Sequence, residues 1–338
     1  MLLNNIWYFL IGVVFTVYII LDGFDLGVGI LNRTLGKTDS ERKRLYYAIG
    51  PFWDGNEVWL LTGGGALFAA FPVVYASVFS GFYLALMLLL FFLILRIVAL
   101  EFRNKLESEK NRLFFDNIFL ISSLLIVLLL GVALGNITRG LELIDGKHYY
   151  GGLMGLLNPY SIFVGIFAIS VVVMHGASFA MIKLDGDIRE RAKKINRYFV
   201  IINLVLYIFS IIITRILLPQ RFINFSNQPV LYSLLIIAPI FLILSLIYNH
   251  KEKYLANFLT GSLFIISIMT IFGIGNYPYL VPSISQNNGL DIYNSASSGN
   301  TLRNMLIITL IGLPFVLFYT IYVHRIFKGV VKAENDTY

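Results

Sequence analysis

The segment 50–72 reads GPFWDGNEVWLLTGGGALFAAFP and has the length of a membrane-spanning helix, yet it carries polar residues that such helices rarely contain. These are two acids and a run of three glycines: Asp54, Glu57, Gly63, Gly64 and Gly65. A carboxylate at the centre of a bilayer costs about 2.5–3.5 kcal/mol even on a lenient insertion scale, so such groups normally face protein or water. Each glycine costs a helix about 1 kcal/mol relative to Ala, but it allows a neighbouring helix or ligand to approach closely. The segment therefore predicts a buried, polar and closely packed site.

The rest of the chain has the composition of a membrane protein. Of its 338 residues, 58% are hydrophobic and 13% are charged, and the mean hydropathy is +0.78. Soluble domains are about 45–50% apolar and about 25% charged. Nine stretches are long enough to cross a bilayer, which takes about 20 helical residues. They lie near residues 6–31, 51–71, 76–100, 114–135, 160–183, 198–218, 230–248, 256–275 and 303–325. The sequence predicts an all-α polytopic membrane protein, folded as a single integral membrane domain over 1–338.

The basic residues predict how this protein is oriented. If the first helix runs inward, 20 of the 26 Lys and Arg residues lie on the inner side and 5 on the outer side, with Arg96 left inside a helix. Positive charge concentrates in cytoplasmic loops. We therefore expect the N-terminus outside and the C-terminus in the cytoplasm. The net charge of +7 follows from this topology, and no nucleic-acid partner is needed to explain it.

The two halves of the chain show a weak internal sequence similarity. The fourth predicted helix ends in Gly135-Asn136 and the eighth ends in Gly275-Asn276. If the first four helices match the next four, the architecture is two four-helix bundles plus one peripheral helix. The loops are too short to form a folded domain outside the membrane.

Polar residues on four helices are predicted to meet in the cytoplasmic half of the membrane. Asp22 and Asp25 are three residues apart and share a helix face, and Gly23 and Gly27 form a small-xxx-small pair that allows close helix packing. The complete predicted cluster is Asp22, Asp25, Asp54, Glu57, Arg96, Glu101 and His175. Chains of intramembrane carboxylates and histidines are typical of proton transfer.

Each member of this cluster also has a structural interpretation. Asp54 falls in the first turn of a helix that starts near Pro51, where the helix dipole alone favours an acid. Arg96 could form a purely structural ion pair with one aspartate, and His175 could be a core histidine. The two aspartates of the first helix require either a partner or a shifted protonation equilibrium.

Haem or metal chemistry fits this chain poorly. It has no cysteine, and of its four histidines only His175 lies well inside a predicted helix, whereas a bis-histidine haem needs two at matching depth. We expect any redox centre to be held by a partner, with no cofactor or metal bound by this chain.

The polar segments together resemble subunit II of the cytochrome bd-type quinol oxidases. The resemblance covers nearly the whole chain and rests on LDGFDLGVG (21–29), the segment 50–72, VYASVFSGFY (74–83), GN-x-x-x-G (135–140), LLNPYSIFVG (156–165), HGAS (175–178), YPYLVPS (277–283) and SASSGNTL (295–302). Asp22 and Asp25 match the acids of the family's DGFD motif. Trp53, Asp54 and Asn56 match its WDGN element, so Trp53 and Asn56 are expected in helix packing or at the subunit interface.

This resemblance implies a function that composition alone does not. The family oxidises membrane quinol and reduces dioxygen to water, and it takes up protons from the cytoplasm. Haem b and haem d belong to subunit I, and subunit II is the haem-free partner that supports assembly and proton or oxygen access. The expected partners are subunit I, membrane quinol and lipids, with a structural quinone or lipid and a small single-helix accessory subunit left open. The expected location is the cytoplasmic membrane of a bacterium.

Two other functions remain open on the residues. A proton-coupled secondary transporter would also carry intramembrane carboxylates, glycine-interrupted helices and an internal repeat. A purely structural assembly subunit would use the same acids only to pair with subunit I.

Overall fold

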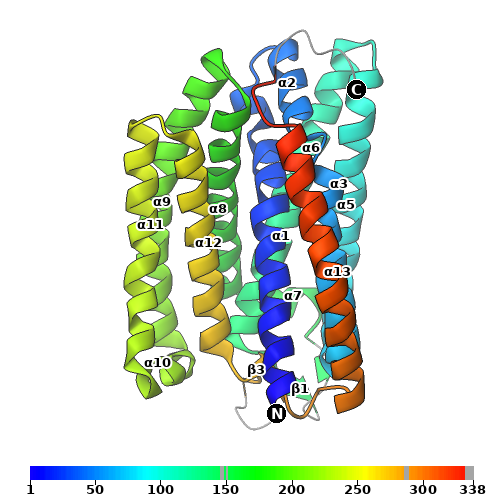
Figure 1. The fold of residues 1–338 in the computed structure, drawn as a ribbon, viewed down its shortest axis with the longest axis vertical. Helices are drawn as coiled ribbons and strands as arrows, with labels where there is room; N and C mark the ends of the chain where they lie inside the picture. The colour runs from blue at the N-terminus through cyan, green and yellow to red at the C-terminus, as the bar shows by residue number, and fades with distance from the viewer. Residues whose placement is uncertain (145–147, 150, 285–288, 332–338) are drawn as a thin grey trace.

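The computed structural model describes residues 1–144, 148–149, 151–284 and 289–331, and most of these form long helices that run side by side (Figure 1). The nine longest helices of the described ranges are α1 (Leu2–Leu35), α3 (Trp53–Ala70), α5 (Tyr83–Phe102), α6 (Glu109–Arg139), α8 (Pro159–Lys183), α9 (Gly186–Leu217), α11 (Tyr232–His250), α12 (Tyr254–Asn276) and α13 (Gly299–Ile326). Within these described ranges, eight helices are long and apolar enough to cross a membrane, and only α3 of this set falls short. The predicted all-α polytopic membrane fold is confirmed.

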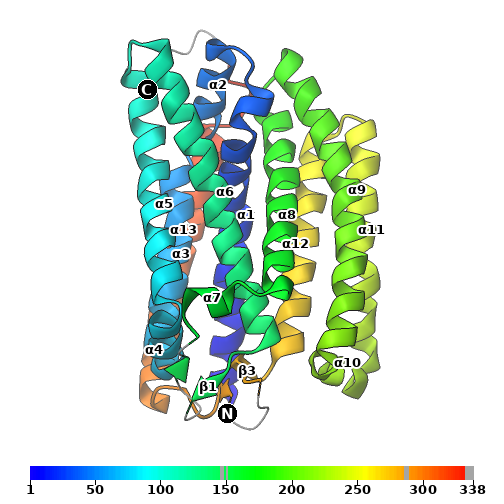
Figure 2. The ribbon, with the colours of Figure 1, turned by 180° about the vertical axis from the view of Figure 1, so that it is seen from behind.

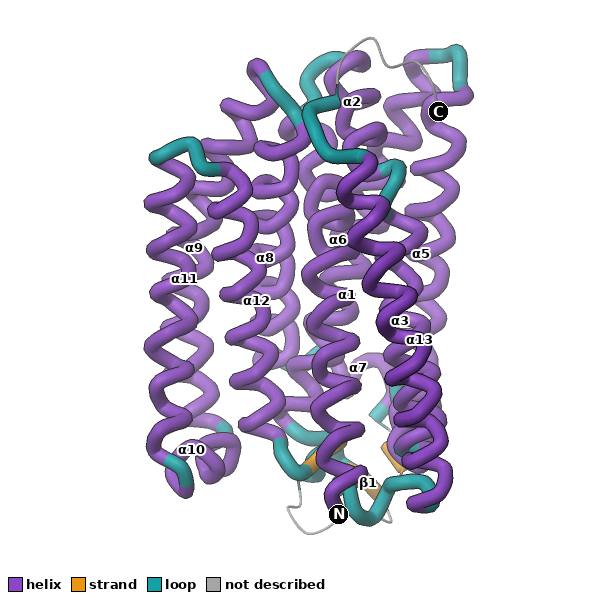
Figure 3. The backbone as a smooth tube through the Cα atoms, in the orientation of Figure 1, coloured by secondary structure: helices purple, strands orange, loops and turns teal. Residues whose placement is uncertain are grey.

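Shorter elements join these helices at the two ends of the molecule. The helical connections are α2 (Asp39–Ile49), α4 (Pro72–Gly81), η1 (Arg103–Lys105), α7 (Gly152–Leu156), η2 (Pro219–Phe222), α10 (Ile223–Asn227) and η3 (Pro229–Leu231). Two antiparallel pairs are formed by β1 (Leu143–Ile144) with β2 (His148–Tyr149) and by β3 (Tyr279–Val281) with β4 (Leu290–Asp291). The strands lie near the N-terminus at one end, and α2 lies at the other end (Figure 3). We call these the N-terminal end and the α2 end.

Several helix starts follow from local chemistry. Thr38 caps α2 by accepting from the backbone N–H of Glu41, whose carboxylate in turn accepts from the N–H of Thr38. This reciprocal arrangement satisfies two otherwise free N–H groups. Asn158 caps α8 in the same position and is followed by Pro159, whose ring suits the first turn of a helix. The sequence prediction did not include α2, because it is short and polar.

The long helices form two groups of four with the same pattern of packing. In the first group α1 packs on α3 and α6, and α6 packs on α5; in the second group α8 packs on α9 and α12, and α12 packs on α11. The groups meet where α8 contacts α1 and α6, as the view from behind makes clear (Figure 2). Helix α13 lies outside both groups against α3 and α1. The two four-helix bundles and the peripheral ninth helix agree with the expectation from sequence.

The groups touch through two glycines that occupy equivalent places in α1 and α8. A Cβ added at Gly27 would lie 2.8 Å from the Cα of Gly176, so the two backbones are in direct contact. One turn earlier, a Cβ added at Gly23 would lie 3.9 Å from the side chain of Val172. Both pairs are separated by 149 positions, which places a pseudo-twofold axis at the α1–α8 contact.

Two predicted helices differ from the observed ones. The predicted segment 76–100 is divided at Phe82, where α4 ends and α5 begins, because the backbone of Phe82 leaves the helical region. The segment 51–71 does form a helix, α3, but Asp54, Asn56 and Glu57 lower its mean hydropathy below that of the other spans. The inside–outside orientation stays a prediction, and two of the cations counted for it, Lys147 and Lys332, lie outside the described residues.

Candidate functional site

A buried ion pair between α1 and α5 forms the centre of the candidate site. The guanidinium of Arg96 donates from Nη1 to Oδ2 of Asp22 at 2.9 Å and from Nη2 to Oδ1 at 2.5 Å. Both side chains are fully buried. This two-point geometry is the strongest form of the Arg–carboxylate interaction. Arg96 is therefore paired with an aspartate, as one interpretation of the sequence proposed.

Asp25 lies one turn further along α1 and is bonded differently. Its Oδ2 accepts from Nδ2 of Asn56 at 2.7 Å, and the same amide donates to the carbonyl of Leu21 at 3.2 Å. Asn56 is 2% exposed and Asp25 is fully buried. Among the described residues, no group donates a hydrogen bond to Oδ1 of Asp25. Asn56 thus fixes one oxygen of Asp25 and joins α3 to α1, while the other oxygen has no donor.

Glu57 adds a third acid beside this pair. It is half-buried on α3, and its Oε2 is buried without a hydrogen-bond partner among residues that the structure describes. Within the described part of the site, Arg96 is the one cation in contact with Asp22, and no ion pair to a cation is formed by Asp25 or Glu57. Two fully buried acids and the half-buried Glu57 therefore lie near one arginine that is paired with Asp22. Such a group can hold and release protons, because an isolated buried carboxylate is disfavoured in its charged form.

Two predicted members of the cluster lie elsewhere. Glu101 is on the surface at the end of α5, where its carboxylate is 49% exposed and 4.0 Å from Lys105. Five residues separate it from Arg96, so the helix turns the two side chains in different directions. Asp54 is exposed on the outer face of α3 in its first turn, as in the helix-dipole interpretation. Asp54 and Glu101 therefore lie outside the buried group within this chain, and their part in a proton-pathway or charge cluster stays a prediction.

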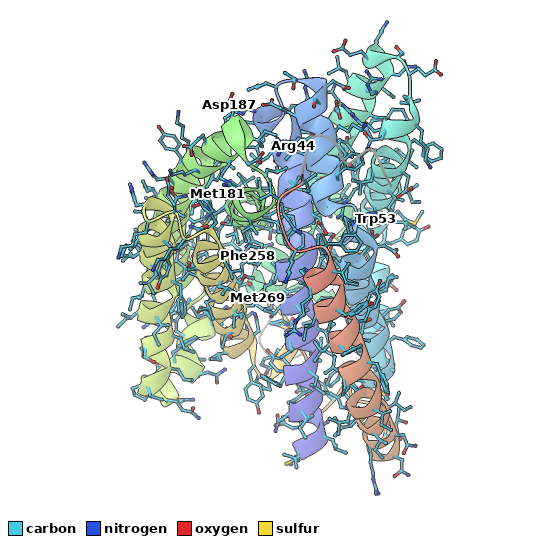
Figure 4. The ribbon with its side chains drawn as sticks, turned by 45° about the horizontal axis from the view of Figure 1, so that its top comes forward. Arg44, Trp53, Met181, Asp187, Phe258 and Met269 are labelled. Carbon is cyan, nitrogen blue, oxygen red and sulfur yellow. The ribbon has the colours of Figure 1, made fainter. Side chains whose placement is uncertain are left out.

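His175 is a buried core residue with a defined packing role. Its Nε2 lies 2.9 Å from the carbonyl of Ile20, and its ring stacks on Phe258 with centroids 4.5 Å apart. Figure 4 labels Phe258 on α12. Since a carbonyl only accepts, Nε2 carries the hydrogen, and Nδ1 has no partner among the described residues. Among the described residues no acid of the cluster is bonded to His175, which instead ties α8 to α1 two residues before Asp22. Its part in the charge cluster stays a prediction.

The glycines that were predicted to allow close packing differ in whether a neighbour approaches them in this chain. Gly27 makes the helix contact already described, and a Cβ added at Gly63 would lie 2.8 Å from the ring of Phe15, which confirms close packing at these two positions. A Cβ added at Gly64 or Gly65 would meet no atom of the described chain within 4 Å. The predicted close approach at Gly64 and Gly65 is therefore not made by this chain. Trp53 is half-buried and packs against the apolar core at the α2 end (Figure 4).

A second charged cluster at the α2 end was missed by sequence reasoning. Asp116 is fully buried in α6, with Oδ2 2.8 Å from Nε of Arg42 and Oδ1 3.0 Å from Nε of Arg103. Asp39 extends the cluster, 2.5 Å from Nη2 of Arg103 and 3.1 Å from Nε of Arg112. These residues are far apart in the chain and sit in predicted loops or helix ends. The sequence shows that this region carries many charged residues, but it does not indicate which acid pairs with which arginine.

A large apolar cavity lies between the two four-helix groups, toward the N-terminal end. Its volume is about 230 Å³, and its walls come from α1, α6, α8, α9, α11 and α12. The residues of its wall that bear on function are Tyr18, Gly23, Tyr160, Tyr207, Thr214 and Arg221. Tyr18 precedes Asp22 by one helical turn, so the cavity reaches the acid cluster at one end. At the other end, Nε of Arg221 donates to the carbonyl of Thr138 at 2.6 Å.

The contacts of the histidines bear on whether this chain could hold a haem. Nε2 of His175 is bonded to the carbonyl of Ile20, and Nδ1 of His324 lies 2.9 Å from the carbonyl of Thr320. His250 is exposed at the end of α11, and the side chain of His148 lies outside the described part of the chain. No group of three or more potential metal ligands occurs within residues 1–144, 148–149, 151–284 and 289–331. That the haems are held by a partner stays a prediction.

Comparison with known proteins decides the family. The model of the family described as "Cytochrome bd terminal oxidase subunit II" matches residues 3–327. The chain belongs to the cytochrome bd terminal oxidase subunit II family. It is 30% identical to cytochrome bd-I ubiquinol oxidase subunit 2 of Escherichia coli (strain K12), covering 99% of this chain and 97% of that one. It is 32% identical to cytochrome bd ubiquinol oxidase subunit 2 of Bacillus subtilis (strain 168), covering 99% of both.

A solved bd oxidase structure agrees in fold with this member of the subunit II family. A chain in the structure of the bd oxidase from Geobacillus thermodenitrificans superimposes with a TM-score of 0.82, at 18% identity, over 97% of this chain and 99% of that one. The agreement extends over both four-helix groups, since nearly all of each chain is included. The family membership makes this chain a multi-pass membrane subunit of a bd-type oxidase.

Proposed function

We propose that this chain is the haem-free subunit II of a quinol oxidase that reduces dioxygen to water, and that it supplies a proton-holding site to the complex. Haem b and haem d reside in the partner, subunit I, and membrane quinol is the electron donor. The observation that carries the proposal is the buried group of three acids with one arginine, in a chain whose relatives are quinol oxidase subunits.

Asp25 is the proton-holding residue of this site. Asp22 is neutralised by Arg96, so a proton held there would break a two-point ion pair. Asp25 has one oxygen fixed by Asn56 and one oxygen to which no residue in the described part of the chain donates. A proton on that free oxygen removes the cost of an isolated charge in a dry interior. Glu57, half-buried on the neighbouring helix, is the second place where the proton can reside.

The test is a set of single substitutions in the purified complex. Asp25→Asn keeps the shape and the bond to Asn56 but cannot exchange a proton, and we expect turnover per haem to fall about a hundredfold, the lower end of what a positioned proton-transfer group contributes. Glu101→Gln is the matched control, since its carboxylate is exposed. Full turnover of Asp25→Asn with normal haem content would contradict the proposal.

The partner subunit covers the outer face of α3 and α13. Along α3, the exposed positions form one stripe that includes Asp54, Leu61 and Phe68, and a carboxylate facing lipid there would be costly. The most apolar stretch of α13 has no buried residue. Gly64 and Gly65, which meet nothing in this chain, lie on or beside the same stripe. A second chain that supplies a polar partner for Asp54 and packs on these glycines accounts for the whole face.

The apolar cavity between the two groups holds a structural quinone or lipid chain. Its walls are mostly apolar, and the polar side chains among them are Tyr18, Thr138, Tyr160, Tyr207, Ser210, Thr214, Arg221 and Asn276. An isoprenoid or acyl chain suits such a wall, with its polar end toward Arg221. Extraction of the purified complex with organic solvent, followed by mass spectrometry, would identify one bound quinone or lipid per complex. Its loss in a Val171→Trp variant, which fills the cavity, would place it there.

The proposed location is the cytoplasmic membrane of a bacterium, with the α2 end facing the cytoplasm. The concentration of Lys and Arg at that end supports this orientation. The buried acids lie closer to the α2 end than to the strands. Asp25 is bonded to Asn56, which together with Asp54 belongs to the first turn of α3, and α3 begins at the α2 end. This side is the side from which protons are taken up.

A further inference from the structure

A small cavity between α3 and α13 lies next to the buried acids. It is lined by Pro51, Phe52, Gly55, Asn56, Tyr319, Thr320, Val323 and His324. Its volume is about 10 Å³, which is at the lower limit of the space that one water molecule requires. Gly55 keeps this space open, since a Cβ there would already lie 3.6 Å from the ring of Tyr319. The wall offers polar groups from both helices, as a bound water needs.

His324 contributes an imidazole to this wall, a group that can both accept and donate a proton. Its Nδ1 lies 2.9 Å from the carbonyl of Thr320, and since a carbonyl only accepts, Nδ1 carries the hydrogen. The neutral ring then has a lone pair on Nε2. The ring is held in place by Phe52, with centroids 4.6 Å apart. His324 is thus oriented with a proton-accepting atom available.

The opposite wall of the cavity leads to Asp25. Asn56 lines the cavity and also donates to Oδ2 of Asp25 at 2.7 Å. Oδ1 of Asp25 has no donor among the described residues. A buried carboxylate oxygen without a donor either holds a proton or is bonded by water. A water beside Asn56 would meet this requirement and connect the carboxylate to the cavity.

The two buried histidines can be told apart by their surroundings. His175 directs Nε2 to the carbonyl of Ile20, and its other nitrogen faces Gly261, with 3.7 Å to a Cβ built there. Its ring is stacked on Phe258, and no cavity includes it among the described pockets. His324 lies on the other side of Phe24, with 6.4 Å between ring centroids, and lines the cavity. Only His324 has both an available nitrogen and space for water.

Residues 327–331, which we call the C-terminal strap, follow directly after α13, the helix that carries His324. The N–H of Val331 donates to the carbonyl of Lys183 at 2.8 Å, and Nη2 of Arg44 donates to the carbonyl of Val331 at 2.8 Å. The ammonium of Lys183 contacts the carbonyl of Phe327 and lies over the ring of Phe52, 4.8 Å from its centroid. The strap fastens the end of α13 to α8 and α2, so the position of His324 is fixed relative to α3.

We infer that the cavity between Asn56 and His324 is the entry point through which protons reach Asp25, with His324 as the relay. This inference rests on the proposed proton-holding role of Asp25. A proton from the α2 side binds Nε2 of His324, passes to the water in the cavity, and reaches the free oxygen of Asp25, while His324 returns to its neutral form. No electron moves in this step, and the charge of the proton is transferred from the ring to the carboxylate.

The experiment uses the purified oxidase complex with haem content measured for every variant. His324→Ala removes the relay and leaves room for a small molecule, and we expect turnover to fall about tenfold or more, because a positioned proton-transfer group contributes ~10² when its step is rate-limiting. Added imidazole should restore most of the rate, and a larger solvent isotope effect should accompany the loss. His250→Ala is the matched control, since this histidine is exposed at the end of α11.

A second variant pair tests the cavity without touching a titratable group. Gly55→Val fills the space, whereas Gly12→Val is the matched control, because Gly12 is exposed on α1 and a Cβ there meets nothing within 4 Å in the described chain. We expect Gly12→Val to keep normal turnover and Gly55→Val to reproduce the slow phenotype without imidazole rescue. Normal turnover in both His324→Ala and Gly55→Val, with Asp25→Asn inactive, would overturn the entry point and leave Asp25 in its role. Normal turnover in Asp25→Asn would overturn the proposed function itself.

Discussion

The two aspartates of α1 lie three residues apart, yet their environments differ sharply. Asp22 has a buried guanidinium bonded to both oxygens, whereas Asp25 has an amide on one oxygen only. A buried ion pair is strongly destabilised when one partner is removed, by about 3–5 kcal/mol, because the remaining charge is left without compensation. The two positions should therefore respond to the same substitution in different ways, Asp22 in stability and Asp25 in proton transfer.

Replacing Arg96 with Gln is expected to lower the stability of the complex by about 3–5 kcal/mol, since the Asp22 carboxylate loses the one cation that the described residues place in contact with it. The measurement is thermal unfolding of the purified complex in detergent. The double variant Asp22→Leu/Arg96→Met should recover most of the loss, because it removes both charges. A double variant as unstable as Arg96→Gln would show that the pair serves something other than charge compensation.

The exposed end of the Arg42–Asp116–Arg103 cluster should make stability depend on pH. Burial alone would raise the pKa of Asp39, but Arg103 and Arg112 outweigh it and hold this pKa below its usual range. A carboxyl with a lowered pKa in the folded state stabilises the protein above the unfolded pKa of about 4, and this stabilisation is lost as the pH falls through the folded pKa. Asp39→Asn should therefore be less stable than the parent chain at pH 7.

This difference should narrow as the pH falls below about 4. Thermal unfolding of the parent and Asp39→Asn chains across this range is the measurement. Glu107→Gln is the control, because Glu107 is exposed on the neighbouring loop. A gap between Asp39→Asn and the parent that stays constant down to pH 3 would mean that the arginines do not act through the charge of Asp39.

Among the helices, the α1–α8 contact makes the clearest prediction. A Cβ at Gly27 would lie 2.8 Å from the backbone of Gly176, and neither backbone can yield without moving a helix. We expect Gly27→Ala to cost about 1–3 kcal/mol, as overpacking does in other cores. Thermal unfolding of the complex would measure the loss.

Gly64→Ala is the matched substitution for a glycine with open space around it in this chain. In the isolated chain it should be neutral or stabilising by up to about 1 kcal/mol, because Ala favours a helix. A loss of subunit I from this variant, with the isolated chain intact, would place Gly64 at the subunit contact. Equal stability of Gly27→Ala and Gly64→Ala in every preparation would contradict the close packing of α1 on α8.

The helices were largely predictable from sequence, because runs of about 20 apolar residues leave few alternatives in a membrane. The break at Phe82 was not, since its residues are apolar on both sides and only the backbone changes direction. For the site, the motif residues Asp22, Asp25, Asn56 and Arg96 could be placed together by depth. Depth alone does not give the direction of a side chain around the helix, so it could not show that Asp54 and Glu101 are exposed in this chain and that His175 is bonded to a backbone carbonyl. His324 was missed because its helix appeared peripheral.

At the scale of the whole molecule, the orientation in the membrane can be tested by labelling single introduced cysteines, because the sequence has no cysteine of its own. Ser108→Cys lies in the loop between α5 and α6 at the α2 end, and Glu142→Cys lies beside the strands at the other end, both at exposed positions. In intact cells, a membrane-impermeant maleimide should label Glu142→Cys and spare Ser108→Cys, because positive charge favours the cytoplasm.

Permeabilised cells are the control for this labelling, since both cysteines should then react. The reverse labelling pattern in intact cells would mean that the chain has the opposite orientation in the membrane, with the α2 end outside. It would also place the cavity beside His324 on the wrong side for proton uptake.

The contact between Gly27 and Gly176 has a consequence for how the two halves of the chain hold together. Residues that meet their own counterparts across a twofold axis are typical of an isologous dimer, so the two four-helix groups are arranged like the two subunits of such a dimer, joined here in one chain. A side chain at either glycine displaces the opposite helix, so the two positions are constrained together. The groups differ in charge: acids and an arginine gather where α1, α3 and α5 meet, whereas the second group carries neutral amides such as Asn196, Asn249 and Asn257. A chain severed between α6 and α8 should therefore reassemble as a dimer of unlike halves through this same surface.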